Sequence, residues 1–368
     1  LIKTIWMSKK PLILGIESSC DETAASLITE SKDGMPVVLS NIISSQIDIH
    51  KKFGGVVPEL AARSHIEKID WIVKKAINDG GKKIEDIDAV ASTAGPGLIV
   101  CLSIGLSFGK ALASSINKPF IAVNHLEGHA LSPKLNSKLD YPYLLLLISG
   151  GHSQFLNVKG LGNYKRLGTT IDDALGEAFD KTAKLLGIEF PGGPKIEILA
   201  KNGNPNKYIL PKPIFNKGGC NLSFAGLKTA ILRISKDIKT SREKSDLAAS
   251  FQKTVEEILY KKTKIAFDEF EKQNKLNEKI FVVAGGVAAN KNIRSMLKNL
   301  CKEKNYKDIF SPIEFCGDNA AMIAMVGLEK FKLNQFNGLD YPAKPRWPLD
   351  EKAIFLKGAG VKLWDDTG

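Results

Sequence analysis

The sequence predicts an α/β protein of two lobes, each built around its own sheet. Three observations support this prediction. Short apolar runs typical of buried strands alternate with longer amphipathic segments typical of helices. A pattern of strand, small polar turn and second strand occurs at residues 12–28 and again at 143–158, which indicates a duplicated half. A chain of 368 residues is also long enough to bury two cores.

The first lobe is predicted at residues 11–135, completed by 317–349 from the end of the chain. Its strands are expected within 11–28 (two strands around a polar turn), then at 37–43, 87–93 and 119–123. The segment FGGVVPELAARSH leads into a helix whose inner face is predicted to hold four apolar residues at helical spacing: Ile66, Ile69, Val73 and Ala76. The glycine turn AGPG precedes a second helix at 102–116, whose small residues permit close packing against the sheet.

The second lobe is predicted at residues 140–316. Its strands are expected at 143–148, 154–158 and 280–284, and its helices at 172–187, 223–239, 247–274 and from Asn290. The long third helix should bury four residues, Phe251, Val255, Ile258 and Leu259. A last apolar helix at 318–331 returns to the first lobe. Residues 1–10 and 350–368 are expected to be flexible tails, with Met7 as a candidate true start.

Composition is that of an ordinary globular protein, with 43% hydrophobic and 25% charged residues. No apolar run approaches the roughly 18 residues of a membrane span, and the N-terminus does not resemble a signal peptide. The five cysteines are scattered and form no CxxC pair. This pattern argues against a disulfide framework or a zinc ribbon and favours a reducing cytoplasm.

The net charge of +12 is concentrated in one third of the chain. Residues 201–310 contain 23 Lys and Arg against 11 Asp and Glu, so this segment carries the whole excess. Such a basic segment suggests a polyanionic partner, and nucleic acid is the first candidate. A lysine-rich solvated surface is the alternative, and Lys228 and Arg233 fit either interpretation.

The segment NHLEGH holds the strongest candidate for a metal site. It follows the strand-like run at 119–123, and its histidines, His125 and His129, are four residues apart. On a helix this spacing places both imidazoles on one face, within reach of one metal ion. Asp318 follows a strand-like run in a similar setting. Two imidazoles and a carboxylate form an open metal site, although histidines at this spacing are more often ordinary surface or core residues.

Three turns complete the candidate site. The first, ESSCDET, supplies Asp21 and Glu22 as candidates for a general base. The second, SGGH, has glycines whose backbone N–H groups can approach an anion. A third turn, GGVAAN, can hold an adenosine or a phosphate but lacks the GxGxxG spacing of a dinucleotide site. Taken alone, Asn290 after this turn is a helix N-cap, and the carboxylates Glu177 and Asp180 are a solvated helix surface.

Eleven motifs in one order resemble a single family, the TsaD threonylcarbamoyltransferases, formerly described as sialoglycoprotein endopeptidases. They are ESSCDET, GGVVPELAAR, TAGPGL, NHLEGH, SGGH, DDALGEAFDKTAKLLG, PGGP, SFAGLKT, AGGVAAN, CGDNAAMIA and PRWPL. The resemblance covers about residues 11–349 and implies a two-lobed actin/Hsp70-like (ASKHA) fold with duplicated RNase H-like sheets. It also implies transfer of a threonylcarbamoyl group from threonylcarbamoyl-AMP to N6 of adenosine 37, just 3′ of the anticodon, in tRNAs that read A-starting codons, with release of AMP.

The resemblance assigns roles to individual residues of this chain. His125, His129 and Asp318 match the ligands of one divalent metal, Fe²⁺ in preference to Zn²⁺. The substrate-binding turn corresponds to five residues, Ile148, Ser149, Gly150, Gly151 and His152. Asp180, Gly193 and Asn290 match nucleotide contacts. Glu197 stands where some relatives have Asp, and its longer carboxylate can still reach a ribose hydroxyl. The implied partners are tRNA, a paralogous TsaB-like subunit and a small TsaE-like ATPase, without a membrane.

Three other functions account for only part of this sequence. A zincin metalloprotease needs HExxH, whereas HLEGH places Glu127 midway between the histidines. An actin-fold small-molecule kinase would share the turns but gives no reason for two histidines and an aspartate at one metal. A non-catalytic nucleotide-binding partner subunit would not need the three metal ligands that this chain retains.

Overall fold

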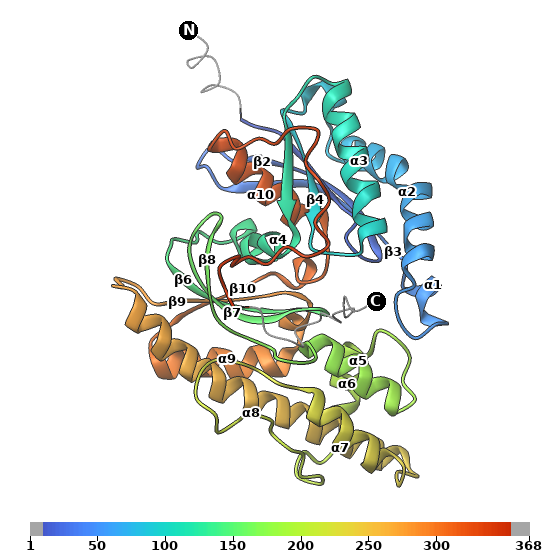
Figure 1. Cartoon of the computed structure of the whole chain (residues 1–368), viewed down its shortest axis with the longest axis vertical. Coiled ribbons are helices and arrows are strands. Elements are labelled where there is room, and N and C mark those ends of the chain that lie inside the picture. The colour runs from blue at the N-terminus through green and yellow to red at the C-terminus, as the bar shows by residue number, and fades with distance from the viewer. Residues whose placement is uncertain (1–9, 355–368) are drawn as a thin grey trace, which may run out of the picture. The chain divides into compact units, whose positions relative to one another are not determined.

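The computed structural model describes residues 10–354. Residues 1–9 and 355–368, with Met7 and most of both expected tails, lie outside the described part. The described chain divides into two compact units (Figure 1). The first unit comprises residues 10–139 and 317–351, and the second comprises 140–316 and 352–354. Each unit is built on a five-stranded sheet, so the expected α/β class is confirmed.

The sheet of the first unit has the strand order β3-β2-β1-β4-β5. The strands are β1 (Ile13–Glu17), β2 (Glu22–Glu30), β3 (Pro36–Ser45), β4 (Ala89–Gly95) and β5 (Phe120–Asn124). The first three form an antiparallel meander, and β4 and β5 add in parallel to β1. Because β1, β4 and β5 are parallel, their carboxyl ends meet at one edge of the sheet.

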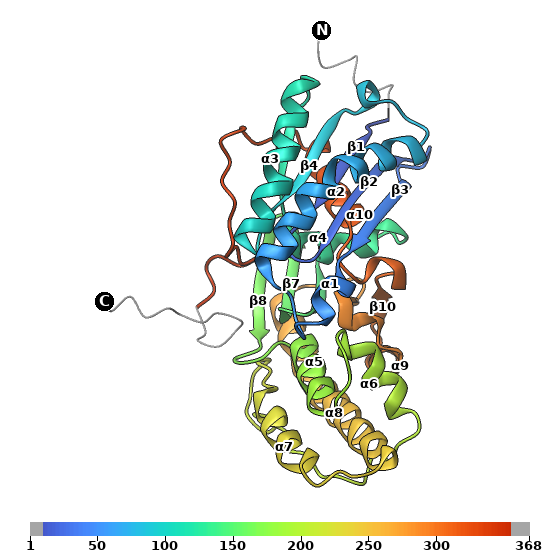
Figure 2. The same ribbon diagram turned by 90° about the vertical axis from the view of Figure 1, so that its right-hand side faces the viewer.

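Helices cover both faces of this sheet. They are α1 (Ile47–Lys51), α2 (Pro58–Asp79), α3 (Ile99–Ser115), α4 (His125–Leu131) and α10 (Ala320–Lys332), with 3₁₀ turns η2 (Ile84–Asp86) and η3 (Ser132–Leu135). Figure 2 shows α2 and α3 side by side against the sheet. A Cβ at Gly109 of α3 would meet Ser92, whereas one at Gly327 of α10 would meet Ala91. Adjacent strand residues point to opposite faces, so α3 and α10 lie on opposite sides of β4.

The sheet of the second unit repeats this topology with the strand order β10-β9-β6-β7-β8. Its strands are β6 (Tyr143–Ile148), β7 (Ser153–Gly160), β8 (Asn163–Thr169), β9 (Ile280–Ala284) and β10 (Lys307–Phe310). Again a three-stranded antiparallel meander is followed by two parallel strands. The duplication predicted from the two strand–turn–strand patterns is therefore confirmed.

The helices of the second unit share one core with the sheet. They are α5 (Leu175–Leu185), α6 (Gly192–Ala200), α7 (Ala225–Ser235), α8 (Ser241–Gln273) and α9 (Lys291–Lys304), with turns η4 (Gly286–Ala289) and η5 (Ile313–Phe315). The helix α8 buries the apolar side chains predicted for it, including Phe251 and Ile258, against this core. Thr240 caps its first turn by accepting from Glu243 N.

One prediction about the core is wrong. Ile66, expected on the inner face of α2, is 65% exposed, whereas Ile69 and Val73 are buried as predicted. The buried stripe of α2 instead runs through His65, which is fully buried. Its Nδ1 lies 2.7 Å from Thr23 Oγ1, and its Nε2 donates to Cys20 O at 3.0 Å. Apolar periodicity placed the stripe one residue late because a hydrogen-bonded polar side chain occupies a core position.

The helices α5, α7 and α10 begin two or three residues later than predicted. The helix α5 starts at Leu175, because Asp172 accepts hydrogen bonds from Phe224 N at 2.7 Å and Ala225 N at 3.3 Å and so caps α7. The helix α10 starts at Ala320, which leaves Asp318 in the loop before it. Among residues 10–354, no helix is both long and apolar enough to cross a membrane.

Candidate metal centre and its surroundings

The helix α4 places two histidines at the edge where the parallel strands end. Asn124, the last residue of β5, is its N-cap: Oδ1 accepts from Leu126 N at 2.9 Å and from Glu127 N at 3.4 Å. His125 and His129 are therefore one turn apart, with ring centroids separated by 4.8 Å. Both rings are buried. The spacing predicted from NHLEGH thus brings the two imidazoles together.

The third member of the site comes from the loop before α10. Asn319 caps this helix by accepting from Met322 N at 3.0 Å, which leaves Asp318 at the helix entrance. The helix packs on α4 at Gly128, where a Cβ would lie 3.1 Å from Met322 Cγ. This close approach brings the carboxylate of Asp318 to the imidazoles of α4.

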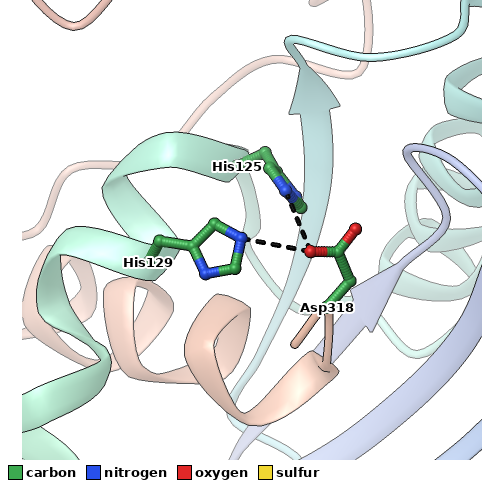
Figure 3. A group of neighbouring side chains, drawn as sticks. All are labelled: His125, His129 and Asp318. Carbon is green, nitrogen blue, oxygen red and sulfur yellow. Dashed lines mark hydrogen bonds and ion pairs between the residues drawn. The ribbon is translucent and has the colours of Figure 1, made fainter. Parts of the chain in front are cut away.

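Figure 3 shows both imidazoles directed at one oxygen of Asp318. Asp318 Oδ1 lies 3.1 Å from His129 Nε2 and 3.4 Å from His125 Nε2. The three residues each offer a ligand atom, and these atoms lie within 4.8 Å of one another. Two neutral imidazoles and a carboxylate are a donor set suited to a divalent transition metal with open positions. The residues present therefore fit a metal.

The electrostatics of the cluster favour a positive charge at its centre. Burial would raise the pKa of Asp318, but the neighbouring imidazoles of His125 and His129 hold that pKa well below its usual range. Burial opposes charge on His125 as well, yet the carboxylates of Asp318 and Glu17 raise its pKa well above the usual value. A site that binds a proton this strongly offers the same electrostatic attraction to a cation.

Glu127, the acidic residue between the two histidines, points away from the cluster. Its Oε2 lies 3.2 Å from the Nζ of Lys330 in α10, and that Nζ also donates to Ala122 O at 3.2 Å. Glu127 is buried and its partner nearly so. This glutamate thus ties α4 to α10, which agrees with the exclusion of a zincin.

The turn ESSCDET borders the same cluster. Ser19 Oγ lies 3.2 Å from His125 Nδ1. Asp21 is buried, and Glu22 shares a hydrogen bond with it. Burial, together with the charges of Asp318 and Asp21, raises the pKa of Glu22 to about 10. Glu22 therefore keeps its proton at neutral pH.

In the second unit, the turn SGGH closes between β6 and β7. Ser149 N donates to His152 O at 2.8 Å, and His152 N donates to Ser149 Oγ at 3.2 Å. A Cβ on Gly150 or Gly151 would meet nothing within 4 Å, so packing inside the chain does not demand glycine there. The open space leaves this backbone accessible to a ligand.

The remaining predicted contacts lie on neighbouring helices of the second unit. Asp180 Oδ1 accepts from Gly192 N at 2.7 Å, next to Gly193. Glu197 accepts from Lys291 N at 2.8 Å, beside Asn290. These two hydrogen bonds join α5 to α6, and α6 to the start of α9. The structure therefore brings Gly193 next to Asp180, and Glu197 next to Asn290.

Asn290 performs the capping role expected of it, since Oδ1 accepts from Ile293 N at 3.0 Å. Its amide also pairs with Gln252, a buried residue of α8: Asn290 Nδ2 donates to Gln252 Oε1 at 2.9 Å. Sequence reasoning missed Gln252. The one available signal was a polar residue on the otherwise apolar face of a long helix.

The family assignment follows from comparison with known proteins. The profile of the family "TsaD: tRNA N6-adenosine threonylcarbamoyltransferase" matches residues 37–325. The chain belongs to this family. A protein of that name from Pelagibacter ubique (strain HTCC1062) is 78% identical over 97% of this chain and 100% of its own length. Another, from Rickettsia rickettsii (strain Sheila Smith), is 52% identical over 92% of this chain and 98% of its own.

The name of the family states its activity, which is transfer of a threonylcarbamoyl group to N6 of an adenosine in tRNA. The chain is thus an acyltransferase. Among solved structures, HypF of T. kodakarensis superposes with a TM-score of 0.59 at 15% identity, over 88% of this chain and 48% of that one. At this identity the likeness concerns the fold alone. The fold is the two-lobed actin/Hsp70-like fold that the motifs implied.

Proposed function

We propose that the chain takes the threonylcarbamoyl group from threonylcarbamoyl-AMP, transfers it to N6 of adenosine 37 in tRNAs that read A-starting codons, and releases AMP. The observation that carries this proposal is the convergence of His125, His129 and Asp318 on one point, next to the acidic turn. The amine of adenine is a weak nucleophile, so the acyl group must be polarised and held in place. A buried cluster of this kind suits that task.

In this proposal the two histidines and Asp318 hold one divalent metal, for which Fe²⁺ is the first candidate and Zn²⁺ the second. When bound, the metal supplies Lewis acidity at the carbonyl oxygen of the transferred group. Asp21 accepts the proton that the adenine amine loses on acylation. Glu22, which is protonated at neutral pH, donates a hydrogen bond to Asp21 and keeps that carboxylate in place.

We assign the donor nucleotide to the second unit. The open backbone of Gly150 and Gly151, within the turn Ile148–His152, can donate N–H groups to the phosphate that leaves with AMP. Asp180, Gly193, Glu197 and Asn290 are the proposed contacts of the adenosine. Two hydrogen bonds support this grouping, because they join the helices that carry these residues.

For tRNA we propose a contact surface on α7. Lys228 and Arg233 of this helix and Lys236, its C-cap, are exposed, and none has an ion pair among the described residues. Replacing all three by alanine should weaken tRNA binding and flatten its dependence on salt concentration, since fewer counterions are released. Three other exposed lysines of the same unit provide the control: Lys201, Lys261 and Lys275. Equal losses in both triple variants would contradict a specific surface.

We further propose a paralogous TsaB-like subunit and a TsaE-like ATPase as partners. Exposed apolar side chains on adjacent helices of the first unit support a protein partner: Ile66 and Trp71 on α2, and Ile99 on α3. We place the reaction in the cytoplasm, because its acceptor is tRNA and because all five cysteines are free thiols.

The transfer reaction itself tests the proposal. Purified chain, with the partner subunit and ATPase, receives threonylcarbamoyl-AMP and unmodified tRNA, and the modified nucleoside is detected by mass spectrometry. Product should form with wild type and with His50→Ala, and be lost with His125→Ala and after chelation. His50 is the matched control because it is a buried histidine of the same unit whose Nε2 contacts Gln46, outside the cluster. Product from His125→Ala would refute the metal mechanism, and no product from wild type would refute the function.

A further inference from the structure

Glu17 is a buried carboxylate that has no part in the reaction as proposed. It ends β1 and is 1% exposed. Its Oε2 lies 2.9 Å from His125 Nδ1 and accepts from Thr93 Oγ1 at 2.7 Å. Its Oε1 accepts from Ser19 N at 2.5 Å. Both oxygens therefore have hydrogen-bond donors from the first unit, and the carboxylate is held in one orientation.

This contact determines which nitrogen of His125 is free. A carboxylate only accepts hydrogen bonds, so Nδ1 of His125 must carry a proton to bind it. Nε2, which lies 3.4 Å from Asp318 Oδ1, is then the nitrogen whose lone pair becomes available when the neutral imidazole binds a metal in place of a proton. Ser19 Oγ also lies near Nδ1, at 3.2 Å, but a hydroxyl can donate or accept and does not select a tautomer.

The second histidine of the cluster has no such support. His129 Nδ1 is buried and has no hydrogen-bond partner among residues 10–354. Its Nε2 still points at Asp318 Oδ1, at 3.1 Å. The two imidazoles are therefore held differently: the ring of His125 by a carboxylate, and that of His129 by packing within the buried helix α4.

We propose that Glu17 is a positioning residue of the metal centre: its carboxylate holds His125 in the tautomer and orientation that present Nε2 to a divalent metal. This inference rests on the proposed metal site. In such carboxylate–histidine–metal arrangements the outer carboxylate also makes the imidazole a stronger ligand. Glu17 acts through His125 and touches neither the metal nor the substrate.

Metal affinity of the full chain tests this role without any need for activity. Chelator-treated protein is titrated with Co²⁺, followed by its visible absorption, and with Zn²⁺ in competition with a chromophoric chelator. Glu17→Gln keeps the shape of the side chain but sets an N–H₂ group against one of its donors. We expect a loss of about 10- to 100-fold in affinity and an altered Co²⁺ spectrum. Ser19→Ala, which removes only the hydroxyl near Nδ1, should bind like wild type.

The possible outcomes distinguish the role of Glu17 from the proposed metal site on which that role rests. Unchanged affinity in Glu17→Gln, with binding lost in His125→Ala, would overturn the role of Glu17 and leave the metal centre intact. Failure of wild type to bind either metal would overturn both. Circular dichroism monitors folding. If Glu17→Gln does not fold, Thr93→Val takes its place, because it removes only the hydroxyl that orients Oε2. Wild-type affinity in folded Thr93→Val would then overturn the proposal.

Discussion

Replacing Gly15 by alanine should damage the metal centre from a distance. Gly15 lies in the middle of β1, where α10 crosses the sheet. A Cβ at this position would lie 2.6 Å from Ala324 N and 2.7 Å from Ala324 Cβ, and would also meet Ala320 O. Ordinary contact between such atoms begins at about 3.5 Å, so the start of α10 must retreat by about 1 Å. Asp318, two residues before that helix, moves with it.

Two effects of known size follow from this displacement. Overpacking of this kind costs about 1–3 kcal/mol of stability. Metal ligands tolerate errors of only about 0.2 Å, so a shift of about 1 Å at Asp318 should cost most of the metal affinity. Misplacement of a catalytic group by about 1 Å costs on the order of 100-fold in rate. We therefore expect Gly15→Ala to fold but to bind Co²⁺ weakly and transfer slowly.

Two other glycines provide matched controls for this variant. Gly327→Ala overpacks the same helix just past its midpoint, where a Cβ would lie 2.6 Å from Ala91 Cβ, about 14 Å along the axis from Asp318. Gly55→Ala enters open space. Urea denaturation should show similar losses of stability for the variants at 15 and 327, while the metal titration should be impaired chiefly at 15. Wild-type metal affinity in a folded Gly15→Ala would refute the reasoning.

The remaining predictions concern buried charge and titration. Lys330→Met should lower the free energy of unfolding, measured by urea denaturation, by about 3–5 kcal/mol, because Glu127 loses a buried partner. Adding Glu127→Met should recover most of this loss, and no recovery would contradict the pairing. Burial lowers the pKa of His65 below 6.5, so as pH falls the unfolded chain binds a proton that the folded chain resists. Stability should fall below about pH 6.5, and His65→Asn should reduce that slope in pH-dependent thermal melts; an unchanged slope would exclude this cause. Burial raises the pKa of Cys220 to about 11 and of Cys301 to about 12, so a thiol reagent at pH 8 should modify them only after denaturation.

The pattern of apolar and polar residues predicted the fold well where the apolar residues of a segment are the ones that it buries. All five strands of the first sheet and three of the second, β6, β7 and β9, were predicted because they contain short apolar runs next to polar turns, and their repetition indicated the duplication. The strands β8 and β10 were not predicted, because β8 is mostly polar and β10 has only four residues. The helix α2 shows the limit of this approach. Its core stripe passes through His65 and not Ile66, because Thr23 and the carbonyl of Cys20 satisfy the imidazole. Those partners lie more than forty positions away, beyond any local pattern.

For the candidate site, spacing alone paired His125 with His129, since four residues make one helical turn. Asp318 could only be suggested, because nothing local joins it to residues almost two hundred positions earlier. Its place beside them depends on the packing of α10 against α4. The contact of Glu17 with His125 also depends on tertiary packing, because it joins the ends of two strands separated by β4. Local chemistry thus specified most of the elements and the spacing of the two histidines, whereas the long-range packing of those elements decided which side chains meet.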